Sequence, residues 1–124
     1  WANHANEGKL AIQETLDFDR AIGEVLRFAR KRGNTLVIVT ADHESGGMAL
    51  QPGSKRGKIK TEFTTNGHTG SMVPVYAFGP GAEAFGGIYE NTEIYNKMRE
   101  FLSWGPEKIT TSSINSSAQS LLPK

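Results

Sequence analysis

Four residues of this chain could bind a metal ion: three histidines and one aspartate beside them. His43 follows Asp42 after an aliphatic run, and His68 follows an Asn-Gly turn signal. His4 lies in a short polar segment, so none of the histidines occupies an apolar position of a predicted helix. Imidazole and carboxylate groups are the ligands of zinc and related divalent ions. From residue types and positions alone, a metal site and ordinary surface histidines are equally good interpretations.

The element that positions Asp42 and His43 is the segment from Leu36 to Thr40. It is an unbroken aliphatic run rich in β-branched residues, which predicts a short strand buried on both faces. The glycines that follow at 46 and 47 let the backbone turn away. A buried strand with polar ligands at its carboxyl end is typical of α/β active sites. We therefore predict that Asp42 and His43 bind metal.

Other predicted elements surround this strand. Apolar residues at helical spacing predict a helix from Lys9 to Arg32, with Asn6 as its N-cap and Gly33 just beyond its end. Segments 48–50, 60–65 and 72–78 are rich in β-forming residues, and Pro74 indicates an edge or a bulge. A last helix is predicted from Asn91 or Thr92 to about 104, and residues 105–124 form a Ser/Thr-rich tail that we expect to be loosely ordered.

The composition is that of one globular domain of 124 residues. The net charge of +1 gives no general electrostatic reason to bind nucleic acid or an anionic membrane. The sequence has no apolar run long enough to predict a transmembrane segment. The absence of cysteine excludes disulfides and thiolate metal ligands, but it does not indicate a compartment.

Segment 35–47, Thr-Leu-Val-Ile-Val-Thr-Ala-Asp-His-Glu-Ser-Gly-Gly, closely resembles the metal-binding segment of the alkaline phosphatases. Segments 1–6, 67–81 and 91–94 resemble further parts of that family, in the same order and at similar spacing. The resemblance covers about residues 1–103. It implies an α/β fold, namely part of a three-layer α/β/α sandwich with a central, mostly parallel sheet. Residues 1–104 would form the C-terminal part of that domain.

The resemblance also implies roles for the four residues. His4 and His68 would bind one zinc ion, and Asp42 and His43 would bind a second. The family hydrolyses phosphate monoesters by double displacement through a phosphoserine intermediate, and it also uses Mg²⁺. Secretion or a periplasmic location is implied by the family alone, and a homodimer is left open.

The chain departs from the family pattern at its beginning. The aspartate expected four residues before His4 would precede Trp1. The family's serine nucleophile, magnesium ligands and phosphate-binding arginine would also lie upstream. We therefore expect an N-terminally truncated chain that holds no catalytic nucleophile and is inactive alone, with the rest of the enzyme upstream or in another chain. Ser45 is not a credible substitute nucleophile, and Glu44 is interpreted as a loop residue in preference to a group that supports a ligand.

Two alternatives to the phosphatase hypothesis remain at this point. A phosphodiesterase, phosphomutase or sulfatase of the same superfamily would share the metal ligands, because the residues that set specificity lie upstream. A non-catalytic metal-binding module would account for the missing nucleophile. The sequence does not identify the substrate beyond the class of phosphate monoesters.

Overall fold

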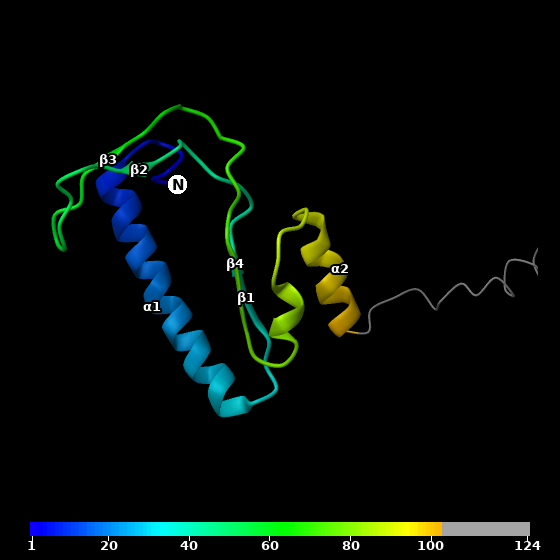
Figure 1. The fold of residues 1–124 in the computed structure, drawn as a ribbon. Coiled ribbons are helices and arrows are strands. Elements are labelled where there is room, and N and C mark those ends of the chain that lie inside the picture. Colours follow the sequence, from blue (N-terminus) through cyan, green and yellow to red (C-terminus); the bar gives the residue numbers. More distant parts are fainter. Residues whose placement is uncertain (103–124) are drawn as a thin grey trace, which may run out of the picture. The chain divides into compact units, whose positions relative to one another are not determined.

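The computed structural model describes residues 1–102, which fall into two compact units, Trp1–Gly87 and a second that begins at Ile88. The predicted tail at 105–124 and the predicted helix end near 104 lie outside the described residues. In the first unit the elements are α1 (Gly8–Arg32), β1 (Val37–Thr40), β2 (Ala49–Leu50), β3 (Thr61–Glu62), β4 (Val75–Phe78) and the 3-10 helix η1 (Ala82–Phe85). Helix α1 contacts both β1 and β3, and the β2–β3 pair lies beside the start of this helix (Figure 1).

Helix α1 ends as predicted and begins differently. Gly33 adopts a left-handed conformation with φ 73°, and its amide donates to the Ala29 carbonyl over 2.8 Å, which closes the last turn. At the other end Glu7, not Asn6, occupies the N-cap position, and no side chain caps the helix. The prediction for Asn6 is wrong because its side-chain amide donates to the Thr65 carbonyl and to Asn66 instead.

The strands pair in two antiparallel ladders. In the first, Val37 is opposite Phe78 and Thr40 is opposite Val75; in the second, β2 pairs with β3. The expectation of mostly parallel pairing is therefore wrong for the strands in the described residues. Parallel neighbours need a crossover, usually helical, whereas residues 41–74 between β1 and β4 form loops and the β2–β3 hairpin.

Little of this unit is buried. The prediction that this strand is buried on both faces is wrong for β1. Only Val37 is buried, while Ile38 and Val39 are half-buried. On the predicted apolar face of α1, Ala29 is buried, but Phe18 remains 55% exposed. The buried hydrophobic residues among those described are Ala2, Ala11, Ala29, Val37 and Phe85. Large apolar side chains of α1 thus remain uncovered by the described residues.

The second unit contains helix α2 (Thr92–Phe101), which was predicted from about the same start. Asn91 precedes it without a side-chain cap bond, and Leu102 follows its last residue. The Lys97 ammonium lies 4.7 Å from the centre of the Tyr89 ring, a cation–π contact. No helix in the described part of the chain combines the length and the hydropathy needed to cross a bilayer.

Candidate metal centre

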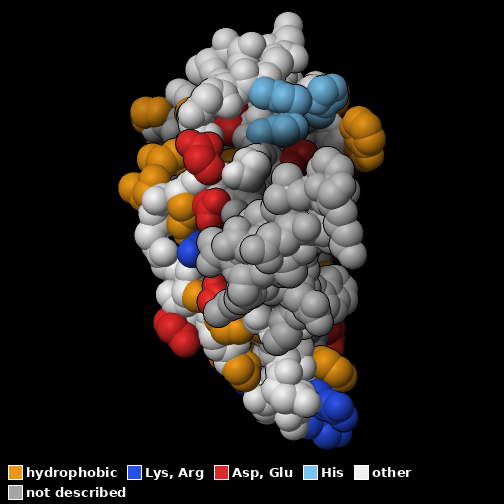
Figure 2. Space-filling model, turned by 90° about the vertical axis from the view of Figure 1, so that its right-hand side faces the viewer, with side chains coloured by type: hydrophobic (Ala, Val, Ile, Leu, Met, Phe, Trp, Pro, Cys, Tyr) orange, Lys and Arg blue, Asp and Glu red, His pale blue; other side chains and the backbone are white. Residues whose placement is uncertain are grey.

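The structure brings the three histidines together from three separate segments. His4 lies in the turn before α1, His43 in the loop after β1, and His68 in the loop between β3 and β4. The rings of His43 and His68 stack with centres 3.7 Å apart, and the His4 ring centre is 5.7 Å from that of His68. Figure 2 shows the histidine side chains gathered at one place on the surface. Residues up to 64 positions apart in the sequence therefore form one cluster.

Asp42 joins this cluster through His43. Its Oδ1 accepts the His43 backbone amide over 3.0 Å, and its Oδ2 lies 3.3 Å from Nε2 of the His43 ring. The other ring nitrogen, Nδ1, lies 3.0 Å from the Glu44 carbonyl. A neutral ring that donates from Nδ1 to this carbonyl leaves the Nε2 lone pair free to bind a metal ion.

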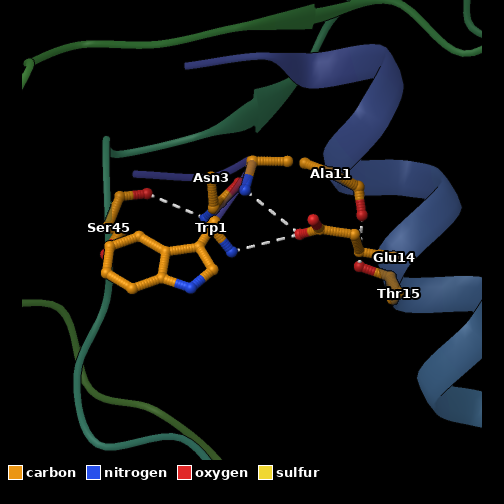
Figure 3. Close-up of polar contacts among 7 residues, drawn as sticks. Trp1, Asn3, Ala11, Glu14, Thr15 and Ser45 are labelled. Carbon is orange, nitrogen blue, oxygen red and sulfur yellow. Dashed lines mark hydrogen bonds and ion pairs between the residues drawn. The ribbon is translucent and has the colours of Figure 1, made fainter. Parts of the chain in front are cut away.

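The segment that carries His4 is tied to the other two loops. The side-chain amide of Asn3 donates to the Ser45 carbonyl over 2.9 Å (Figure 3), and that of Asn6 donates to the Thr65 carbonyl over 2.9 Å. Asn6 has φ 56°, a left-handed conformation that asparagine tolerates better than most residues. The two asparagines flank His4 and thus fix its position against both loops.

Glu14 of α1 holds the first residues of the same segment. Its carboxylate accepts the Ala2 amide over 3.1 Å and lies 3.3 Å from the Trp1 amino group (Figure 3). The bond from Ala2 is the main cause of a lowered pKa of Glu14. The turn that carries His4 is therefore anchored to the helix as well as to the loops.

Backbone bonds at Gly46 join the loop of His43 to the loop of His68. The Gly46 amide donates to the Gly67 carbonyl over 2.8 Å, and the Gly46 carbonyl accepts the Thr64 amide over 2.9 Å. Gly46 is buried and has φ 81°, a conformation in which glycine avoids the steric cost of a side chain. The main chains of the two loops are thereby held side by side.

Glu44 makes a second connection between these loops, and its interpretation as a plain loop residue is wrong. Its Oε1 accepts the Gly47 amide over 2.8 Å, and its Oε2 accepts the Thr69 amide over 3.2 Å together with the Thr69 hydroxyl. The Thr69 hydroxyl is the main cause of a lowered pKa of Glu44, and the backbone amides of Gly47, Thr69 and Met48 act in the same direction. Sequence reasoning missed this role because Thr69 lies 25 positions away.

Among residues 1–102, no three His, Asp or Glu side chains are arranged so that they could hold one metal ion together. The cluster instead consists of neighbouring imidazoles and one carboxylate, and these potential ligands are accessible to solvent. His43 and Asp42 have side chains that are 43% and 86% exposed. Any metal ion bound here would need further ligands from outside this set.

Comparison with known proteins places the chain in a family. The family model described as alkaline phosphatase matches residues 1–60 and 54–104. Alkaline phosphatase of Escherichia coli K12 is 32% identical over 117 residues, covering 81% of this chain and 25% of that protein. This chain belongs to the alkaline phosphatase family.

Solved structures agree with this assignment. Alkaline phosphatase from the Antarctic bacterium TAB5 is 47% identical, with a TM-score of 0.76 over 86% of this chain and 33% of that one. A variant of the TAB5 enzyme at 46% identity, with the same TM-score, has Mg bound in its M3 site. The fold of the described chain is thus that of part of an alkaline phosphatase, and the chain spans a quarter to a third of the length of these relatives.

Proposed function

We propose that this chain is the C-terminal part of a zinc-dependent alkaline phosphatase that hydrolyses phosphate monoesters through a phosphoserine intermediate. Residues 1–104 would belong to one three-layer α/β/α domain whose other elements, including the serine nucleophile, lie upstream or in another chain. The observation that carries the proposal is the convergence of His4, His43 and His68, with Asp42 beside them, in a chain of this family. As in the family, a periplasmic or secreted location would follow.

The distance between Asp42 and His43 fits a zinc ion. Zinc bound to histidine nitrogen and carboxylate oxygen at about 2.0–2.1 Å in tetrahedral geometry holds those two atoms about 3.3–3.4 Å apart. Oδ2 of Asp42 and Nε2 of His43 are separated by 3.3 Å. This agreement supports assigning both residues to the same ion, and the bond between Nδ1 and the Glu44 carbonyl supports Nε2 as the ligand atom.

His4 and His68 would bind the second zinc ion. That ion would neighbour the one bound by His43, because the His43 and His68 rings stack with their centres 3.7 Å apart. Two such ions supply charge stabilisation to both the attacking and the leaving oxygen at phosphorus. The residues of this chain would hold that positive charge in place, whereas Mg²⁺ would be bound by residues outside the chain.

Within this proposal, the rest of the domain packs against apolar side chains of α1 that are exposed in this chain. Helix α1 leaves Leu16, Phe18 and Phe28 more than half exposed, at 55–58%. Large apolar side chains left exposed on a helix favour a partner surface when they lie together. Within the proposal they are covered by the rest of the same domain, which separates this function from that of a stand-alone metal-binding module.

The proposal is tested by hydrolysis of an aryl phosphate at alkaline pH with added Zn²⁺ and Mg²⁺. The complete enzyme, meaning this chain together with the rest of the domain, is expected to be active, and the 124-residue chain alone is expected to be inactive. Adding a phosphodiester and a sulfate ester as parallel substrates distinguishes the related activities. Preference for either of these over the monoester would refute the phosphatase assignment.

We expect the isolated chain to bind zinc weakly, because each ion finds only two of its protein ligands. Complete structural zinc sites provide about 10–16 kcal/mol, so a half-built site should provide less than ~8 kcal/mol, which corresponds to a Kd above ~1 μM. Isothermal titration of the chain with Zn²⁺ measures this value. Tight binding of two ions by the chain alone would contradict the assignment of two ligands to each.

A further inference from the structure

Glu44 contacts both of the loops that carry the stacked histidines, and the proposed function does not use these contacts. It directly follows His43, and its partner Thr69 directly follows His68. The Glu44 carbonyl lies 3.0 Å from Nδ1 of the His43 ring, while its carboxylate accepts both the amide and the hydroxyl of Thr69. One residue thus contacts the ring of one histidine and the neighbour of the other.

The contacts of the Glu44 side chain require a carboxylate. Three donors converge on its two oxygens: the amide of Gly47, the amide of Thr69 and the hydroxyl of Thr69. An ionised carboxylate only accepts hydrogen bonds, so it matches all three donors. A glutamine of the same size would replace one acceptor oxygen with an NH₂ group and would set a donor against a backbone donor.

The bonds at Gly46 suggest that Glu44 does more than hold the loops together. The Gly46 amide already donates to the Gly67 carbonyl, and its own carbonyl accepts the Thr64 amide, so the loop backbones are joined there without Glu44. The further ties to these loops, from Asn3 to Ser45 and from Asn6 to Thr65, also lie away from the side of Thr69. The bridge from Glu44 to Thr69 is the contact that joins the residues directly following His43 and His68.

We propose that Glu44 is a positioning residue that fixes the relative position of the His43 and His68 rings as metal ligands. This inference rests on the proposed function, because the rings matter only as ligands. Glu44 itself contacts no substrate and is not a metal ligand in this proposal. Its effect passes through the two histidines that it orients.

The test compares Glu44→Gln with matched variants of the complete enzyme. Zinc affinity is measured by competition with a chromophoric chelator, and the visible spectrum of the Co²⁺-substituted enzyme reports ligand geometry. Groups that orient metal ligands typically contribute 10–100-fold to metal affinity, so we expect Glu44→Gln to weaken Zn²⁺ binding by that factor and to alter the Co²⁺ spectrum. Thr69→Val should also weaken Zn²⁺ binding, whereas Thr69→Ser, which keeps the hydroxyl, should retain the original Zn²⁺ affinity.

The control is Glu62→Gln, which makes the same chemical change at an exposed position of β3 and should leave both measurements unchanged. If Glu44→Gln lowers only the melting temperature while the Zn²⁺ affinity and the Co²⁺ spectrum stay the same, the role is purely structural and the inference is wrong. The His43→Ala variant shows whether the metal site exists at all, and so distinguishes a wrong inference about Glu44 from a wrong proposed function. Unchanged zinc binding in His43→Ala would refute the metal site itself.

Amide hydrogen exchange in the metal-free complete enzyme tests the bridge independently of any metal. The amides of Gly47 and Thr69 should be protected in the original chain and should exchange at least ~10-fold faster in Glu44→Gln, while the Gly46 amide keeps its protection. Equal exchange of the Gly47 and Thr69 amides in both proteins would show that the bridge does not form, and the inference would fall.

Discussion

His43→Ala is expected to reduce kcat/KM for an aryl phosphate by about 10³-fold in the complete enzyme. The change removes Nε2, the ring nitrogen that lies 3.3 Å from the Asp42 carboxylate, so one proposed zinc ion keeps a single ligand from this chain. A bound metal ion is worth several kcal/mol of transition-state stabilisation, and each 1.36 kcal/mol is tenfold in rate. The measurement is steady-state hydrolysis at alkaline pH, with zinc content determined on the same samples.

The His43→Asn variant tests the loss of the proposed ligand atom Nε2 while keeping a donor for the hydrogen bond to the Glu44 carbonyl. An asparagine amide can replace the Nδ1 donor to the Glu44 carbonyl, but it has no counterpart of Nε2. We expect it to be as impaired as the alanine variant, and Arg56→Ala at the exposed tip of the β2–β3 hairpin to keep the original activity. Original zinc content and activity in His43→Asn would mean that Nε2 is not a ligand.

Gly46→Ala is expected to lower the free energy of unfolding by about 2–5 kcal/mol. A left-handed conformation costs a residue with a Cβ atom ~1–2 kcal/mol, and overpacking adds ~1–3 kcal/mol. Both apply here, because Gly46 has φ 81° and an added Cβ would lie 2.6 Å from the Phe63 ring and 2.7 Å from Oδ1 of Asn6. Chemical denaturation of the complete enzyme measures the loss.

Gly33→Ala is the matched control for this prediction. Gly33 has a similar φ of 73°, but an added Cβ there meets nothing within 4 Å. It should therefore show only the conformational cost, ~1–2 kcal/mol, while effects on the unfolded chain cancel between the two variants. Equal losses for both would mean that the contact of Gly46 with Phe63 and Asn6 is not tightly packed.

The elements that depend on local sequence were predicted well. The apolar spacing and the Gly33 stop signal located α1, which the structure places at Gly8–Arg32, because helix hydrogen bonds and caps join residues close in sequence. The β-rich segments likewise contain all the strands described. Burial was overestimated at β1 and on α1, since burial depends on what packs against an element and not on its own pattern.

Contacts between distant residues were not predictable in the same way. Asn6 has the right chemistry for an N-cap, but its amide is used by Thr65 and Asn66, about 60 positions away. Glu44 carries no local signal for its bond to Thr69. The histidine cluster was expected from a family pattern, and its ring distances became visible only when the loops were placed together.

The bonds at Gly46 and Glu44 also close segment 44–69 into a loop whose two ends are joined. Inside it the Gln51 amide donates to the Lys60 carbonyl over 2.9 Å, closing the neck of the hairpin. The tip beyond that neck, residues 52–59, is nearly all exposed and has no role in holding the ligands. Loop tips of this kind accept insertions, since lengthening a closed loop costs little entropy. This hairpin is therefore a position where we expect an affinity peptide or a second domain to be inserted without disturbing the histidine cluster.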